Sequence, residues 1–197
     1  IKLENLNSPD YKKQTSRIDN NLLTSSLTIK DSNLDRIKIF INGGNVEDSL
    51  NIVNSNGNID IIEVQNSFQD AIDFDFSNLK IKKIIVKNAG NDCLDMSSGR
   101  YSVKSLEVNK CLDKGVSVGE NSFVSIKDAF IKNTKFALVS KDSSELTVEN
   151  GFLNSNTYCI AAYTKKQEFG PAKVTVPKDI CPSNKFLIQK FSSLITK

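Results

Sequence analysis

Residues 70–76 read Asp-Ala-Ile-Asp-Phe-Asp-Phe, and residues 92–98, which lie 22 positions later, read Asp-Cys-Leu-Asp-Met-Ser-Ser. The apolar position at Ile72 recurs at the same step, as Leu94, Val116, Leu138 and Ile160. Within each unit, apolar residues alternate with polar ones, which is the period of a β-strand that buries one face. Short strands repeated at a fixed step of this length predict a solenoid.

The repeat predicts an all-β chain, folded as a single-stranded right-handed parallel β-helix with about 22 residues in each of six to seven coils. A second apolar column at the same step is expected to complete the core, and it comprises Val64, Val86, Val108, Phe130 and Phe152. Asn and Gly, which favour turns, separate the strands, and the 22 Asn residues can stack as ladders along the axis. We expect strands at 59–65, 71–76, 81–87, 93–97, 103–109, 115–118, 123–131, 136–140, 145–153 and 158–163.

The repeat is expected to occupy residues 36–164, flanked by a partial coil or cap at 1–35 and by a loop and a final coil or cap at 165–197. Because the sequence begins with Ile1 and not Met, we expect a processed chain, a recombinant fragment, or part of a longer protein with further domains. No apolar run approaches the ~18 residues of a spanning helix, so no membrane span is predicted. The four Cys residues allow the disulfides Cys93–Cys111 and Cys159–Cys181, or buried free thiols.

The amino-acid composition excludes some kinds of catalytic site, metal site and binding partner. The chain has no His, which excludes an imidazole base and imidazole metal ligands. The net charge of +3 hides an acidic region, because residues 45–79 contain seven Asp and Glu and no Lys or Arg. Local fields therefore matter more than the total charge. No basic stripe interleaved with aromatic residues is visible in the sequence, so a nucleic-acid partner is not expected.

Three outward columns of the predicted helix carry the polar side chains. The first contains Asp48, Asp70, Asp92 and Lys114, the second contains Asp73 and Asp95, and the third contains Asp75 and Lys141. Neighbours in a column should lie roughly 5 Å apart, so these acids should form one patch. They could cap backbone N–H groups at the turns, bind Ca²⁺ through Asp73, Asp75 and Asp95, or act as catalytic carboxylates on a glycan.

Three segments resemble the successive motifs of polygalacturonases, which are pectin-cleaving β-helix hydrolases. They are Asp70-Ala-Ile-Asp73, Asn91-Asp-Cys-Leu94 and Asp113-Lys-Gly-Val-Ser-Val-Gly119. The resemblance implies that Asp70 and Asp92 hold an attacking water. It is incomplete, because Asn91 stands where the family has its general acid and Lys114 stands where it has His. More broadly, the chain resembles the β-helix repeat proteins of the pectate-lyase-like superfamily found on bacterial surfaces.

Two functions follow from this pattern. The first is a secreted or surface protein that binds or processes a polysaccharide, with Asp70, Asp92 and Lys114 as candidate catalytic residues of a hydrolase or lyase. Lys114 would then be a proton abstractor, although we favour its alternative role as a salt-bridge partner that neutralises the acids. Substrate-binding residues would be Asp73, Asp95, Lys141, Tyr158 and Tyr163. The two tyrosines suit sugar rings, unless the loop at 164–171 covers them. The second is a noncatalytic, adhesin-like spacer module of an extracellular protein.

Overall fold

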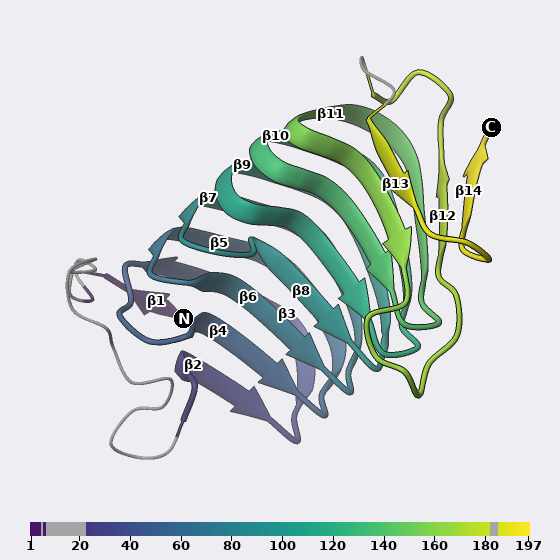
Figure 1. Cartoon of the computed structure of the whole chain (residues 1–197). Helices are drawn as coiled ribbons and strands as arrows, with labels where there is room; N and C mark the ends of the chain where they lie inside the picture. Colours follow the sequence, from purple (N-terminus) through teal and green to yellow (C-terminus); the bar gives the residue numbers. More distant parts are fainter. Residues whose placement is uncertain (5, 7–22, 182–184) are drawn as a thin grey trace.

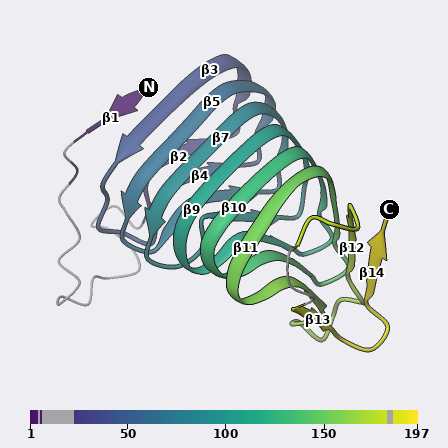
Figure 2. The ribbon, with the colours of Figure 1, turned by 90° about the horizontal axis from the view of Figure 1, so that it is seen from above.

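The chain forms an all-β parallel solenoid of about eight turns with about 22 residues in each, somewhat more turns than the six to seven expected from the sequence. This computed structural model describes residues 1–4, 6, 23–181 and 185–197, without the side chain of residue 156. The turns follow one another as stacked coils along a single axis (Figures 1 and 2). Among the described residues, no helix is long and apolar enough to cross a membrane.

Successive coils pair in parallel along two faces of the solenoid. On one face the strand order is β3-β5-β7-β9-β10-β11, and on the other β2 pairs β4, β4 pairs β6, β6 pairs β8 and β8 pairs β9. In the later coils the chain continues through the corner between the faces as one long strand (Figure 1). The strands are β1 (Lys2–Leu3), β2 (Ser25–Lys30), β3 (Asn33–Asn42), β4 (Asp48–Val53), β5 (Asn56–Ser67), β6 (Asp70–Asp75), β7 (Asn78–Ala89), β8 (Leu94–Ser97), β9 (Arg100–Gly119), β10 (Phe123–Lys141), β11 (Glu145–Tyr163), β12 (Lys173–Val176), β13 (Phe186–Ile188) and β14 (Ser193–Thr196).

The coils begin within the segment that was predicted to be a partial coil or cap. Strands β2 and β3 start at Ser25 and Asn33, and they pair with β4 and β5 of the next coil. Residues 5 and 7–22 of that segment lie outside the described residues. At the other end, β12, β13 and β14 add further rungs beyond the loop at 164–171, and residues 182–184 are not described.

Asparagine marks one corner of several coils because the backbone there is left-handed. Asn66, Asn88 and Asn133 have φ values of 59°, 60° and 59°, and Lys110 occupies the same corner with φ 68°. Asn tolerates this conformation better than most residues. The side chains also form the expected ladders, since the Asn88 amide donates to Asn66 Oδ1 at 2.9 Å.

A line of buried hydroxyl groups runs along the opposite corner. The Ser55 N–H donates to Ser77 Oγ at 3.0 Å, and the Gly99 N–H donates to Ser122 Oγ at 3.3 Å. Gly99 interrupts the line, and the hydroxyl of Tyr101 takes its place by accepting the Ser77 N–H at 3.3 Å. A Cβ at Gly99 would overlap this hydroxyl, so glycine makes room for the tyrosine. Each coil therefore satisfies a buried backbone donor of its neighbour.

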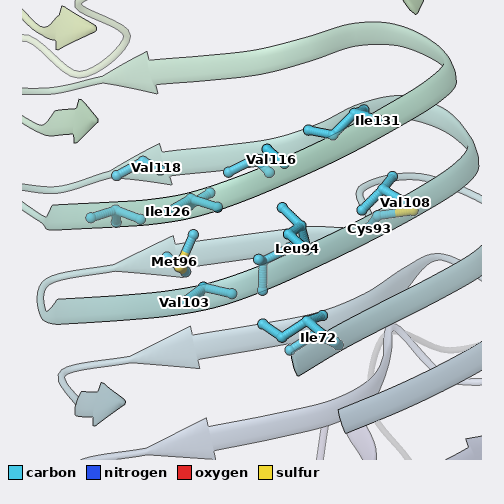
Figure 3. Close-up of a cluster of buried hydrophobic side chains, with 14 of the residues drawn as sticks. Ile72, Cys93, Leu94, Met96, Val103, Val108, Val116, Val118, Ile126 and Ile131 are labelled. Carbon is cyan, nitrogen blue, oxygen red and sulfur yellow. The ribbon is translucent and has the colours of Figure 1, made fainter. Parts of the chain in front are cut away.

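Most of the predicted core is present. Ile72 pairs with Leu94, and Leu138 pairs with both Val116 and Ile160, so this column is continuous and fully buried. The second column departs from the prediction at its later positions: Val108 faces Ile131 rather than Phe130, and Ile131 faces Leu153 rather than Phe152. Figure 3 shows Ile131 and Val108 among the core side chains.

One additional residue causes this difference. Ser97 pairs with Gly119 across 22 residues, but Arg100 pairs with Phe123 across 23, so the turn between β9 and β10 is longer by one. The corner that follows in β10 is shorter by one, which restores the 22-residue step at Lys114 and Phe136. Between these two points the alternation is inverted with respect to the simple repeat. Phe130 and Phe152 therefore face outward, with 53% and 49% of their surface exposed.

Two disulfides fasten the coils. Cys93 bonds Cys111 and Cys159 bonds Cys181, with sequence separations of 18 and 22 residues. The first ties adjacent coils beside the outward acidic residues, and the second fixes the C-terminal segment to β11. Both pairings match those that the sequence allowed, and no described cysteine is a free thiol.

The altered register predicts very different losses of stability when two adjacent residues, Ile131 and Phe130, are truncated. Ile131→Ala removes a fully buried side chain, and we expect it to lower the free energy of unfolding by about 2–5 kcal/mol. Phe130→Ala removes a half-exposed side chain and should cost far less. Urea denaturation of both variants tests this. A larger loss for Phe130→Ala than for Ile131→Ala would restore the simple 22-residue repeat.

Candidate functional site

The predicted outward columns are formed on the face that β4, β6, β8 and the second halves of β9, β10 and β11 make together. Asp48 pairs with Asp70, Asp73 pairs with Asp95, and Lys114 pairs with Phe136. Phe136 in turn pairs with Tyr158. The structure thus brings the predicted acids, lysines and aromatic residues onto one face, where carboxylates occupy the earlier coils and aromatic rings the later ones.

Asp70 and Asp92 hold successive coils together. The Asp92 N–H donates to Asp70 Oδ1 at 2.7 Å, and the Lys114 N–H donates to Asp92 Oδ1 at 3.0 Å. The side-chain amide of Asn91 also donates to Asp70 Oδ1, at 2.8 Å. These contacts are the backbone capping that is one of the three interpretations of the acids. The residue at the family's general-acid position is therefore a hydrogen-bond donor to Asp70.

Lys114 is an ion-pair partner of these acids. Its Nζ lies 3.3 and 3.2 Å from the two carboxylate oxygens of Asp92, and it also contacts the carboxylate of Asp113. Burial disfavours the ammonium, but Asp92 and Asp113 outweigh burial and hold the pKa of Lys114 above its usual range. A lysine that keeps its proton cannot abstract one from a substrate. The geometry thus favours the salt-bridge role over the lyase role.

The second column contains Asp73, whose pKa is raised furthest from its ordinary value. The amide of Asn51 donates to Asp73 Oδ2 at 3.2 Å and to Asp75 Oδ2 at 3.3 Å. Burial, together with repulsion from Asp75 and Asp95, raises the pKa of Asp73 to about 9. Burial also raises the pKa of Asp70 to about 7, with repulsion from Asp92 adding to it. Several of these carboxyls therefore carry protons near neutral pH.

A calcium site was one interpretation of Asp73, Asp75 and Asp95. Within the described ranges, no three Asp, Glu, His or Cys side chains are placed to hold a metal ion. The contacts of Asp73 and Asp75 are instead with the amide of Asn51. Asp95 accepts a hydrogen bond from the Met96 N–H at 3.0 Å and lies near Lys141.

Lys141 is more buried than a substrate-binding lysine was expected to be. Its side chain is only 7% exposed, and its Nζ lies 3.8 Å from Asp95 Oδ2. The Lys141 side chain reaches Asp95 by lying over Gly119, where an added Cβ would come within 2.9 Å of Lys141 Cε. Gly119 therefore gives the lysine its path across the coils. Lys141 offsets the charge of Asp95 rather than extending into solvent.

The aromatic residues of this face are more accessible. The rings of Phe136 and Tyr158 stack with centroids 5.4 Å apart and 20° between planes, and Lys135 Nζ lies 5.5 Å from the Phe136 centroid. Both rings are partly exposed, as is Tyr163. We call Phe136, Tyr158 and Tyr163 the aromatic strip.

The loop at 164–171 makes its hydrogen bonds with the neighbouring turn. The N–H groups of Lys165 and Lys166 donate to Asp142 Oδ1 at 2.6 and 2.8 Å. Lys166 Nζ lies 2.7 Å from Glu120 Oε1, and the Gly170 N–H donates to Ser143 Oγ at 2.7 Å. Phe169 lines a hollow beside Phe123, away from the aromatic strip. These contacts fix the loop beside the strip.

Sequence reasoning missed one accessible surface. Phe130 and Phe152 were assigned to the core, yet they line a cavity of about 370 Å³ on the other face of the solenoid, together with Ile85. The sequence contains a signal for this, because Val124 and Ile126 lie one position out of step with Val103. The same one-residue shift continues along β10 to residue 130.

The buried acids predict an unusual dependence of stability on pH. In the unfolded chain Asp73 ionises near its ordinary pKa of 3.8, whereas the fold keeps it protonated up to about 9. The folded state therefore binds more protons in between, and the free energy of unfolding should fall as the pH rises from 5 to 8. We expect Asp73→Asn to flatten this fall in urea denaturation. The exposed Asp35→Asn is the control, and an equal slope in both variants would contradict the assignment.

The capping role of Asp92 gives a second prediction. Asp92→Ala leaves the buried Lys114 N–H without its acceptor and removes one of two carboxylates from the ammonium. We expect a loss of about 1–3 kcal/mol in the free energy of unfolding. Glu149→Ala, at an exposed position on β11, is the control and should change stability by less than about 0.5 kcal/mol. Thermal and urea denaturation of both variants test this, and equal losses of stability in Asp92→Ala and Glu149→Ala would refute the capping role.

No protein-family model matches the chain, and no curated protein or solved structure matches it significantly. The residues of the two faces are therefore the basis for proposing a function.

Proposed function

We propose that this chain is an extracellular or surface-exposed member of the pectate-lyase-like β-helix group that binds a polysaccharide. The observation that carries the proposal is the Phe136–Tyr158 stack, 5.4 Å between centroids, which continues the column of Asp92 and Lys114. Aromatic side chains provide an apolar surface for a sugar ring, while neighbouring charged groups can bind its hydroxyls. Tyr163 extends the aromatic strip on the same face.

Binding accounts for this face better than cleavage does. Asp70 and Asp92 already accept backbone hydrogen bonds from the next coil, and Asn91 cannot donate a proton to a leaving sugar oxygen. The ammonium of Lys114 is fixed between two carboxylates. The partial resemblance to polygalacturonases supports a shared scaffold and a sugar ligand, without the acid that their hydrolysis requires.

The two disulfides support a location outside the cytosol. Disulfides persist in oxidising compartments and are rare where thiols are kept reduced. All four cysteines are paired, and both bonds join segments that lie on neighbouring coils. This agrees with the extracellular or surface location expected of a protein that meets polysaccharides.

A noncatalytic spacer is the second candidate function. It is favoured by the number of polar side chains that serve the stacking of coils, such as Asp70, Asp92, Ser77 and Ser122. A spacer would hold adjoining parts of a longer chain at a fixed separation, and its faces would need no ligand.

A binding experiment separates the two candidates. We expect the protein to bind at least one member of a polysaccharide array, without any increase in reducing ends. Tyr158→Ala should weaken that binding by about tenfold, the size typical of an anchor residue. Phe191→Ala, at a highly exposed aromatic position near the C-terminus, is the matched control. Absence of binding across the array would favour the spacer, and release of reducing ends would refute the noncatalytic assignment.

A further inference from the structure

A second surface lies on the face formed by β7, β9, β10 and β11. The cavity of about 370 Å³ in this face is lined by Ile85 and Phe130 on either side of Glu107, with Phe152 on the following coil. Cross-strand pairing places these residues in one column, because Ile85 pairs with Glu107, Glu107 with Phe130, and Phe130 with Phe152. The column lies on a different face of the solenoid from the aromatic strip, although both include residues of β10 and β11.

Glu107, which lines the cavity between the apolar side chains, forms an ion pair. Lys83 Nζ lies 2.7 Å from Glu107 Oε1, and Lys83 is one column away from Glu107 on the preceding coil. Val108 and Asn109 line the cavity together with Glu107. A single carboxylate therefore lies between an aliphatic wall and an aromatic wall, with its charge balanced by a neighbouring lysine.

The adjoining column supplies positive charge. Lys87 pairs with Asn109, and Asn109 pairs with Lys132, so two lysines stand on either side of an amide along this column. Both lysines are exposed and both line the cavity. An anion above Asn109 would meet an ammonium from the coil on each side, while its apolar part would face Phe130 and Phe152.

We propose that this cavity binds an acidic sugar unit of a polysaccharide, at a site separate from the aromatic strip. The sugar ring packs against Phe130 and Phe152, where half-exposed aromatic surface is available. Its acid group is held by Lys87 and Lys132. The Asn109 amide donates hydrogen bonds to its hydroxyls or accepts them, and the Glu107 carboxylate accepts hydrogen bonds from them.

The charges on the column favour a sugar over a nucleic acid. A nucleic-acid strand carries a phosphate at every nucleotide and needs a continuous basic track. Here Asn109 separates the two lysines of the column, and the adjoining column carries the carboxylate of Glu107 between two apolar residues, so no continuous basic track is formed. An acidic sugar carries fewer charges and several hydroxyls, which a carboxylate and an amide can bind.

Calorimetric titration of the full chain tests this site with two probes. One is a uronic-acid oligosaccharide, and the other is the same oligosaccharide with its carboxyls reduced to alcohols. We expect the acidic probe to bind at least about tenfold more tightly, and the difference to shrink as salt is added. Phe130→Ala and Lys132→Ala should each weaken binding of the acidic probe by about fivefold or more. Phe123→Ala and Lys104→Ala, which lie on β10 and β9 outside the cavity lining, are the matched controls.

The outcomes separate this site from the aromatic strip. Loss of acidic-probe binding in Tyr158→Ala with none in Phe130→Ala would overturn this inference and leave the proposed function intact. Equal affinity for the two probes would overturn it as well, and so would tighter binding of a single-stranded RNA homopolymer at the same residues. Unchanged thermal midpoints in Phe130→Ala and Lys132→Ala would confirm that any lost affinity reflects the cavity and not unfolding.

Discussion

The hydrogen-bonded register between successive coils is the constraint on which the rest of this structure depends. Each coil lies in parallel alignment with the next, and a residue's neighbours are set by a step of 22 or 23 positions. Backbone donors that fall at corners, where strand pairing is interrupted, are satisfied by side chains of the adjacent coil, as Ser77 Oγ does for the Ser55 N–H. A buried backbone group without a partner is costly, so serine, asparagine and aspartate recur at the corners.

This constraint also explains the acidic face. A column that repeats Asp because one Asp caps the next coil brings carboxylates within a few ångströms of one another. Burial, together with repulsion between the carboxylates, raises the pKa of Asp73 to about 9 and that of Asp48 to about 7. Lys114 offsets the charge of Asp92, and Lys141 offsets that of Asp95. Asp70 and Asp92, the two acids that match the polygalacturonase motifs, thus have a structural role in the stacking of coils.

The sequence was sufficient to predict the solenoid, the Ile72 column and the membership of the outward columns, because strict 22-residue spacing determines all three. It was insufficient for Phe130 and Phe152, whose apolar character fitted a core column that a one-residue change in the preceding turn had moved. The burial of Lys141 was not predicted either. It depends on how the lysine side chain crosses Gly119 on the neighbouring coil to reach Asp95, and the spacing of residues in the sequence does not reveal that path. The cysteine pairs could be proposed from spacing, but choosing between thiols and disulfides required the positions of both partners.

The lengthened turn before β10 has a consequence for how such a chain can change over generations. An insertion at one corner, matched by a deletion at the next, leaves most of the solenoid in frame and inverts only the segment between them. Apolar residues selected for the interior are then presented to solvent as a group, without a single substitution. Phe130 and Phe152 stand in such a segment, so paired length changes at corners offer a repeat protein a short route from a core to a new recognition surface.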